Sequence, residues 1–159
     1  HPQRRDEVEQ SLKRSGLIVA RHSRGDKITA DTDIYLVDAT GLLGQLYRVS
    51  PLAFVGGSLI PHGGQNMLEA AQLGCAVLHG PHVDNFQSIT SDLGAAGASR
   101  EVANREELTL AVAELLGNRE KLETMNQAAE AAASRNQAVL DTTMQRLQPL
   151  LAKAVAGQT

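Results

Sequence analysis

Short apolar runs alternate along this chain with stretches in which apolar residues recur every three or four positions. The short runs are bounded by glycine or polar residues, which is typical of strands buried on both faces. The pattern predicts strands over residues 17–20, 33–38, 52–55, 75–78 and 99–102. It predicts helices over residues 5–14, 43–49, 66–73, 85–93 and 104–116, and two more in the Ala- and Glu-rich tail from residue 118, broken near 134–136.

Strands and helices that alternate in this way indicate an α/β protein with a Rossmann-like parallel sheet, helices on both of its faces and a helical C-terminal extension. A length of 159 residues fits a single domain over residues 1–159. The first element is a helix, whereas doubly wound domains usually begin on a strand, and the chain does not begin with Met. We therefore expect this domain to be truncated at its N-terminus.

Residues 54–71, FVGGSLIPHGGQNMLEAA, hold two glycine pairs between a predicted strand and a predicted helix. Open α/β sheets bind ligands at the carboxyl ends of their strands, and glycines let the backbone approach a ligand closely. The helix start near Asn66 would offer free N–H groups to a phosphate. Neither the dinucleotide fingerprint G-x-G-x-x-G nor a P-loop is present.

A purely structural interpretation of the same helix start is equally open. Asn66 and Glu69 fit the N-x-x-E spacing of a capping box, as Asn104 and Glu107 do further along the chain. A carboxylate in the first turn can also accept hydrogen bonds from the hydroxyl groups of a ribose. The residues alone leave both interpretations standing.

Two other predicted strand ends are candidate ligand contacts. The segment DATG at 38–41 has two interpretations. The favoured one is a plain strand-to-helix turn. In the other, its backbone groups hydrogen-bond to the edge of a nucleotide base. In GPHVDNF at 80–86, His82 is expected to face the same crevice as the glycine pairs, and Asn85 to cap the following helix.

Composition and residue spacing exclude several classes of function. Aromatic residues make up 3% of the chain, Trp is absent and the net charge is −3, which argues against a nucleic-acid-binding surface. The lone cysteine, Cys75, is typical of a reducing compartment, and no apolar run reaches the length of a membrane span. The histidines lack metal-ligand spacing and Ser58 has no neighbouring base, so we expect no metal, no cofactor and no serine hydrolase.

The string FVGGSLIPHGGQNMLEAAQLGCAVLHGPHVDNF resembles the donor-binding half of bacterial 3-deoxy-manno-octulosonic acid (Kdo) transferases. The family pattern is roughly F-V-G-G-S-L-x-x-x-G-G-H-N-P-L-E-x-A, followed by a strand and G-P-H-x-x-N-F. The opening HPQR is similar to the family's P-R-H-P-E-R, and VDATGLLGQLY to its D-T-M-G-E-L segment. The likeness covers essentially the whole chain.

The resemblance implies one half of a GT-B glycosyltransferase that transfers Kdo from CMP-Kdo to a lipid A precursor in lipopolysaccharide biosynthesis, at the cytoplasmic face of the Gram-negative inner membrane. In the family, one contact to CMP is a Pro-Arg that would lie just upstream of this chain. The other contacts match Thr40, Gly41, Leu42, Asn66, Met67, Leu68 and Glu69. Further residues expected to line the donor site are His1, Gly56, Gly57, Ser58, Gly63, Gly64 and His82.

The chain departs from the family pattern at Gln65, Met67 and Leu42, where the family usually has His, Pro and Glu. The family carries its catalytic carboxylate and its acceptor and membrane contacts in an N-terminal half. We therefore expect this chain to bind the donor weakly and to contain no catalytic residue, so that it does not transfer Kdo by itself.

Two alternatives compete with this hypothesis. One is a transferase or epimerase domain that uses a UDP-sugar, and the segments PHGG and GPH..NF argue against it. The other is a non-catalytic module of flavodoxin-like shape that binds no nucleotide.

Overall fold

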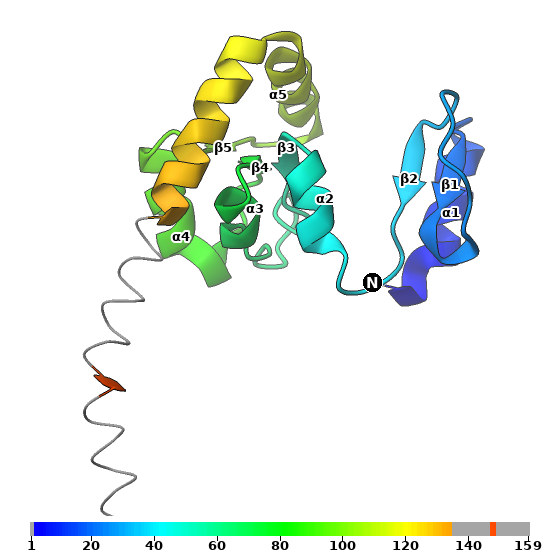
Figure 1. Cartoon of the computed structure of the whole chain (residues 1–159), viewed down its shortest axis with the longest axis horizontal. Coiled ribbons are helices and arrows are strands. Elements are labelled where there is room, and N and C mark those ends of the chain that lie inside the picture. The colour runs from blue at the N-terminus through cyan, green and yellow to red at the C-terminus, as the bar shows by residue number, and fades with distance from the viewer. Residues whose placement is uncertain (1, 135–146, 149–159) are drawn as a thin grey trace, which may run out of the picture. The chain divides into compact units, whose positions relative to one another are not determined.

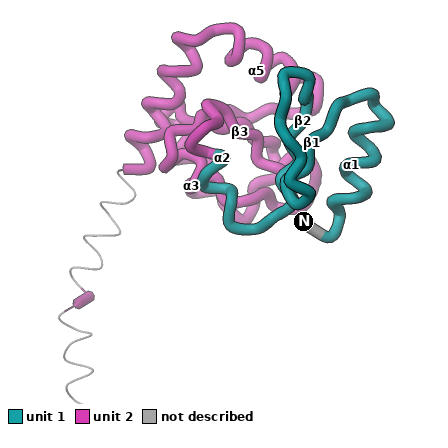
Figure 2. Tube along the Cα trace, turned by 45° about the vertical axis from the view of Figure 1, so that its right-hand side comes forward, with its two compact units in different colours: residues 1–46 teal, residues 47–159 magenta. Residues whose placement is uncertain are grey.

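The structure is a computed structural model that describes residues 2–134 and 147–148 (Figure 1). Packing of the backbone divides the chain into two compact units, residues 1–46 and 47–159, which are considered separately (Figure 2). The expectation of one domain over residues 1–159 stays a prediction. The second tail helix and the break near 134–136 lie at or beyond the edge of the described residues.

The first unit consists of one helix and two parallel strands. A 3-10 turn η1 (Pro2–Arg4) leads into α1 (Arg5–Arg14). The strands are β1 (Val19–Arg21) and β2 (Ile34–Leu36), with Val19 opposite Ile34, and the turn η2 (His22–Arg24) follows β1. Helix α1 forms over the predicted range, and Gly16 follows its end with a φ of 82°, a left-handed conformation that favours glycine.

Charged side chains occupy the interior of the first unit. Arg21 is only 7% exposed, and its guanidinium contacts Asp38 at 2.6 Å, Asp6 at 2.6 Å and Glu9 at 3.0 Å. Asp38 also accepts the N–H and the hydroxyl of Ser23 at 2.9 and 2.6 Å. Strand β1 ends at Arg21, one residue beyond the predicted strand end at residue 20.

The second unit is built on a three-stranded parallel sheet in the order β3-β4-β5. Helix α2 (Leu43–Val49) spans the division between the units and precedes β3 (Leu52–Phe54). The elements that follow are α3 (Leu68–Gln72), β4 (Ala76–His79), the 3-10 turn η3 (Asp84–Phe86), α4 (Gln87–Ala95), β5 (Ser99–Glu101) and α5 (Arg105–Gly117). A further helix covers residues 119–134, so the first helix of the predicted tail is confirmed.

Helices cover both faces of this sheet, as the sequence predicts. The central strand β4 is buried along its whole length, and its side chains alternate between two cores. Val77 packs in a core with Leu93 of α4 and Ala70 of α3. Leu78 packs on the opposite face with Leu115 of α5. The predicted α/β fold class is therefore confirmed.

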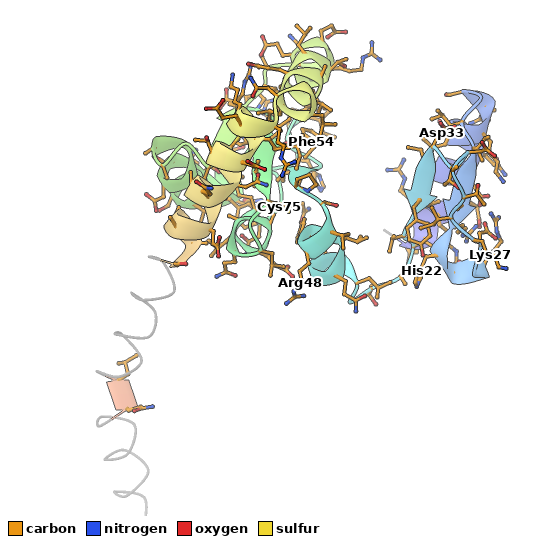
Figure 3. The ribbon with its side chains drawn as sticks, turned by 45° about the horizontal axis from the view of Figure 1, so that its top comes forward. His22, Lys27, Asp33, Arg48, Phe54 and Cys75 are labelled. Carbon is orange, nitrogen blue, oxygen red and sulfur yellow. The ribbon has the colours of Figure 1, made fainter. Side chains whose placement is uncertain are left out.

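The single cysteine is buried inside the second unit (Figure 3). The Cys75 thiol donates to the carbonyl oxygens of Tyr47 and Ser50, at 3.1 and 2.8 Å. Burial raises the pKa of this thiol, so the group stays protonated and behaves as a core residue.

Candidate functional site

A buried serine joins the loops that follow β3 and β4. The hydroxyl of Ser58 donates to the carbonyl oxygen of Val55 and accepts the N–H of Gly80, the latter at 2.8 Å. The carbonyl oxygen of Ser58 accepts the N–H of His82 at 2.9 Å. The predicted site residues Ser58 and His82 are thus held together at the carboxyl end of the sheet.

The second glycine pair packs against the loop after β4. The N–H of Gly64 donates to the carbonyl oxygen of Gly57 at 3.3 Å, and a Cβ on Gly64 would lie 3.2 Å from the carbonyl oxygen of His82. A Cβ on Gly63 would overlap the side-chain amide of Asn85. Gly63 and Gly64 both have positive φ angles, 86° and 72°, so conformation and space each favour glycine here.

Helix α3 begins later than predicted, at Leu68, and is five residues long. The side-chain oxygen of Asn66 accepts the N–H of Leu68 at 2.9 Å, which is the bond of an Asx turn. Met67 is fully buried in the core. The side chain of Met67 is therefore closed to a ligand.

Glu69 is exposed in the first turn of α3, and its carboxylate makes no hydrogen bond or ion pair with any residue that the structure describes. Burial and the nearby charge of Glu69 raise the pKa of the Tyr47 hydroxyl, and no local sequence pattern predicts this neighbour. The carboxylate can accept hydrogen bonds from a ligand without breaking an internal contact.

The same N-x-x-E spacing behaves differently at residues 104–107. There the side chain of Asn104 accepts the N–H of Glu107 at 2.9 Å, and the carboxylate of Glu107 accepts the N–H of Ala103 at 2.9 Å. Capping by Asn104 is confirmed, whereas the reciprocal bond expected from Glu69 is absent. The structural interpretation of Glu69 is therefore wrong.

The strand end in the first unit contains the other predicted contacts. Thr40 and Gly41 are exposed, and the carbonyl oxygen of Leu42 accepts the N–H groups of Gln45 and Leu46, at 3.0 and 3.1 Å, at the start of α2. This segment thus makes a strand-to-helix turn.

A cavity of about 380 Å³ opens at the same strand end. It is lined by residues of α1 and of the segment that ends β2: Arg5, Val8, Leu36, Val37, Asp38, Ala39 and Thr40. Thr40, one of the residues predicted to contact the donor substrate, lines this cavity. The carboxylate of Asp38 is engaged with Arg21 and Ser23, so the open polar groups of the cavity are those of Arg5 and Thr40.

Several predictions for the site are wrong or remain untested. Asn85 does not cap α4, which begins at Gln87 after the turn η3 and has no side-chain cap. His1 lies outside the described residues. Gly56 is exposed, and nothing lies within 4 Å of a Cβ added there. The expectation that residues 40–42 and 66–69 contact one ligand stays a prediction, because they belong to different units.

Neither a metal site nor a membrane span is found among the described residues. Within residues 2–134 and 147–148, no three His, Cys, Asp or Glu side chains are grouped so that they could hold a metal ion. In the same part of the chain, no helix combines the length and the apolar character needed to cross a bilayer.

No family model matches the chain. Curated relatives nevertheless align with most of it. The 3-deoxy-D-manno-octulosonic acid transferase of Bordetella pertussis is 33% identical over 152 residues, which cover 95% of this chain and 36% of the relative. The probable mitochondrial 3-deoxy-D-manno-octulosonic acid transferase of Arabidopsis thaliana is 40% identical over 134 residues, 82% of this chain and 30% of the relative. The chain thus spans about a third of the length of these relatives.

A solved structure matches the fold as well as the sequence. It is the crystal structure of the C-terminal CMP-Kdo binding domain of WaaA from Acinetobacter baumannii, which is 34% identical to this chain. The match has a TM-score of 0.79 and covers 83% of this chain and 69% of the solved one. The fold and the sequence relatives agree, and the chain belongs to the 3-deoxy-D-manno-octulosonic acid transferase family, in the part that corresponds to its C-terminal domain.

Proposed function

We propose that this chain is the donor-binding half of a glycosyltransferase that transfers Kdo from CMP-Kdo to a lipid A precursor. The observation that carries this proposal is the likeness to the WaaA domain, whose described ligand is CMP-Kdo. The likeness covers 83% of this chain at 34% sequence identity.

We further propose which residues contact the nucleotide. Glu69 binds the ribose hydroxyls, since its carboxylate is exposed and lacks an internal partner among the described residues. Asn66, Met67 and Leu68 are the other contacts at this helix start. The side chain of Met67 is buried and that of Asn66 accepts the N–H of Leu68, so Glu69 is the open polar side chain of this group. In the other unit, residues 40–42 form the second contact with the nucleotide.

The remaining steps of the reaction belong, in this proposal, to parts of the longer relatives that the chain does not cover. A GT-B active site lies between two domains, and closure of the domains brings donor and acceptor together while excluding water. The catalytic carboxylate and the contacts to the lipid A precursor and to the cytoplasmic face of the inner membrane would come from the other domain. The reaction as proposed uses no metal.

Nucleotide titration tests the proposal. We expect the chain to bind CMP more tightly than UMP, measured by calorimetry or by ligand-observed NMR. Glu69→Gln removes the charged acceptor and should weaken CMP binding about tenfold or more, as for loss of a hydrogen bond to a charged group. Glu130→Gln is the matched control, because Glu130 is an exposed residue of the 119–134 helix, and it should leave binding unchanged.

Each other outcome contradicts a specific part of the proposal. A preference for UMP would favour a domain that uses a UDP-sugar. No binding of CMP, UMP or CMP-Kdo would favour a module that binds no nucleotide. Unchanged CMP affinity in Glu69→Gln would leave CMP binding intact but would remove Glu69 from the contacts.

A further inference from the structure

The cavity beside Thr40 contains one cationic side chain, that of Arg5. Arg5 and Val8 are three residues apart and therefore lie on one face of α1, which forms one wall of the cavity. The opposite wall is the end of β2 and the turn after it, from Leu36 to Thr40. All these residues belong to the first unit, so the cavity is defined within it.

The guanidinium of Arg5 differs from those of its neighbours in lacking an internal partner. Arg4 pairs with Glu7, and Arg21 and Arg24 both contact Glu9. Arg5 makes no hydrogen bond or ion pair with any residue that the structure describes. Its N–H donors can therefore bind a ligand in the cavity without first breaking an ion pair.

The rest of the lining favours a flat, uncharged group over a phosphate. Val8, Leu36, Val37 and Ala39 are aliphatic, and aliphatic walls suit the faces of a ring. Asp38 also lines the cavity, and its pKa is held well below the usual range by the Ser23 hydroxyl and the Arg21 guanidinium. It stays ionised and paired with Arg21, and its side chain is only 1% exposed, so it offers no open acceptor to a ligand.

Hydrogen-bonding patterns separate the two common pyrimidine bases. Cytosine presents acceptors at O2 and N3 and an amino donor at N4, whereas uracil carries a hydrogen on N3. A guanidinium has only donors, arranged in a rigid planar fork that matches two neighbouring acceptors. It pairs with O2 and N3 of cytosine but meets another donor at N3 of uracil, and a donor left without a partner is costly.

We propose that Arg5 is a specificity-determining residue that donates hydrogen bonds to the pyrimidine of the donor nucleotide and selects cytosine over uracil. This inference rests on the proposed function, since it assumes that the chain binds a cytidine nucleotide. It adds a side-chain contact to the site, where the turn at 40–42 offers mainly backbone.

Binding of CMP, UMP and inorganic phosphate to three variants of the chain tests the assignment. Arg5→Met removes the donors and keeps an unbranched side chain of similar reach. We expect it to weaken CMP binding about tenfold, to change UMP binding little, and so to reduce the preference for CMP. Arg5→Lys keeps the charge but lacks the planar fork, and it should not restore the preference.

Arg14→Met is the matched control. Arg14 lies in the last turn of the same helix, is exposed, and does not line the cavity. The net charge changes by the same amount in both Met variants, so this variant should keep wild-type affinities. Thermal melts that coincide for all variants establish that α1 remains folded.

The outcomes separate this inference from the function on which it rests. If the wild type prefers CMP and Arg5→Met keeps both that affinity and that preference, Arg5 is not a base contact although the donor-binding function stands. Equal losses for CMP, UMP and phosphate, reversed by Arg5→Lys, would assign Arg5 to an anion and overturn the base assignment. A wild type that does not bind CMP would overturn both proposals.

Discussion

At the scale of single residues, the same sequence motif has two different outcomes in this chain. The spacing N-x-x-E occurs at 66–69 and at 104–107. At 104–107 both side chains are engaged with the backbone, while Glu69 has no hydrogen bond among the described residues. The motif predicts a helix start in both places. Only the local fold decides whether the carboxylate is used internally or remains open to a ligand.

Ser58 is a second residue whose role depends on contacts distant in sequence. From the sequence it is a serine without a neighbouring base, and the resemblance places it in the lining of the donor site. In the structure it is fully buried, and its hydroxyl links Val55 to Gly80, 22 positions further along the chain. Its function is therefore to hold two loops together.

Replacing Ser58 by alanine tests this role. Ser58→Ala leaves the carbonyl oxygen of Val55 and the N–H of Gly80 without these bonds, and each unsatisfied buried group costs about 1–3 kcal/mol. For the two groups together we expect the free energy of unfolding to fall by about 2–6 kcal/mol, measured by urea denaturation. The control Ser88→Ala changes an exposed serine of α4 and should alter stability little. Equal stability of the two variants would show that the hydroxyl of Ser58 is dispensable.

At the scale of elements, the alternation of apolar runs and helical patterns predicts the type and order of the elements well. Five predicted strands form, each shifted or shortened by one to three residues at its ends. Helix α3 is shortened the most, from the predicted 66–73 to Leu68–Gln72, and α4 is shifted by two residues to Gln87–Ala95. The glycine-rich loop before α3 packs on the loop after β4, and the side chain of Asn66 bonds the N–H of Leu68 in a turn directly before the helix. The apolar pattern has no information about such contacts between loops.

Gly80 offers a test of how closely these two loops approach. A Cβ on Gly80 would overlap the carbonyl group of Ser58, which is backbone and cannot rotate away. Gly80→Ala should therefore separate the loops and lower the free energy of unfolding by about 1–3 kcal/mol or more. It should also weaken CMP binding, because the separated loops belong to the candidate site.

The matched control for this test is Gly117→Ala at the end of α5, where nothing lies within 4 Å of an added Cβ. There alanine should stabilise the chain slightly, because it favours the helix. Urea denaturation curves of both variants give the two changes in the free energy of unfolding. A Gly80→Ala protein as stable as the wild type would mean that the approach of the loops is not required.

At the scale of the whole molecule, the two units are stabilised by different physical interactions. The sheet of the second unit lies between two apolar cores. In the first unit a buried charge cluster occupies much of the interior. The Lys13 ammonium and the Arg21 guanidinium lower the pKa of Glu9 to about 2, and Ser23 and Arg21 hold the pKa of Asp38 well below its usual range.

This difference predicts how stability depends on pH. Both carboxyl groups have lower pKa values in the folded state than in the unfolded state, so their contribution to stability is present above about pH 4 to 5. It is lost as the pH falls toward the folded-state values. We expect amide hydrogens of α1, β1 and β2 to lose protection against exchange between about pH 5 and 2, before those of β4.

Two variants test whether the loss of stability at low pH comes from the buried charge cluster around Arg21. Asp38→Asn should lower the melting temperature at pH 7, because it weakens the pairing of the buried Arg21, and should flatten the pH dependence of the first unit. Glu114→Gln removes a carboxylate whose pKa is also about 2, lowered by Lys121 and Arg100, but its side chain is 41% exposed. It should change stability little, since exposed ion pairs contribute weakly. An unchanged pH profile in Asp38→Asn would contradict this account.

The sequence by itself determined the α/β class and the order of the elements, because these depend on local patterns of apolar and polar residues. It also predicted a ligand site at the glycine-rich strand end. The resemblance to Kdo transferases also followed from sequence motifs. Only the tertiary structure decided which polar groups remain open. Asp38 and Ser58 are engaged by partners 17 and 22 positions away, whereas Glu69 and Arg5 have none among the described residues. Hydrogen bonds between distant residues form only when the chain folds, so no local pattern predicts them.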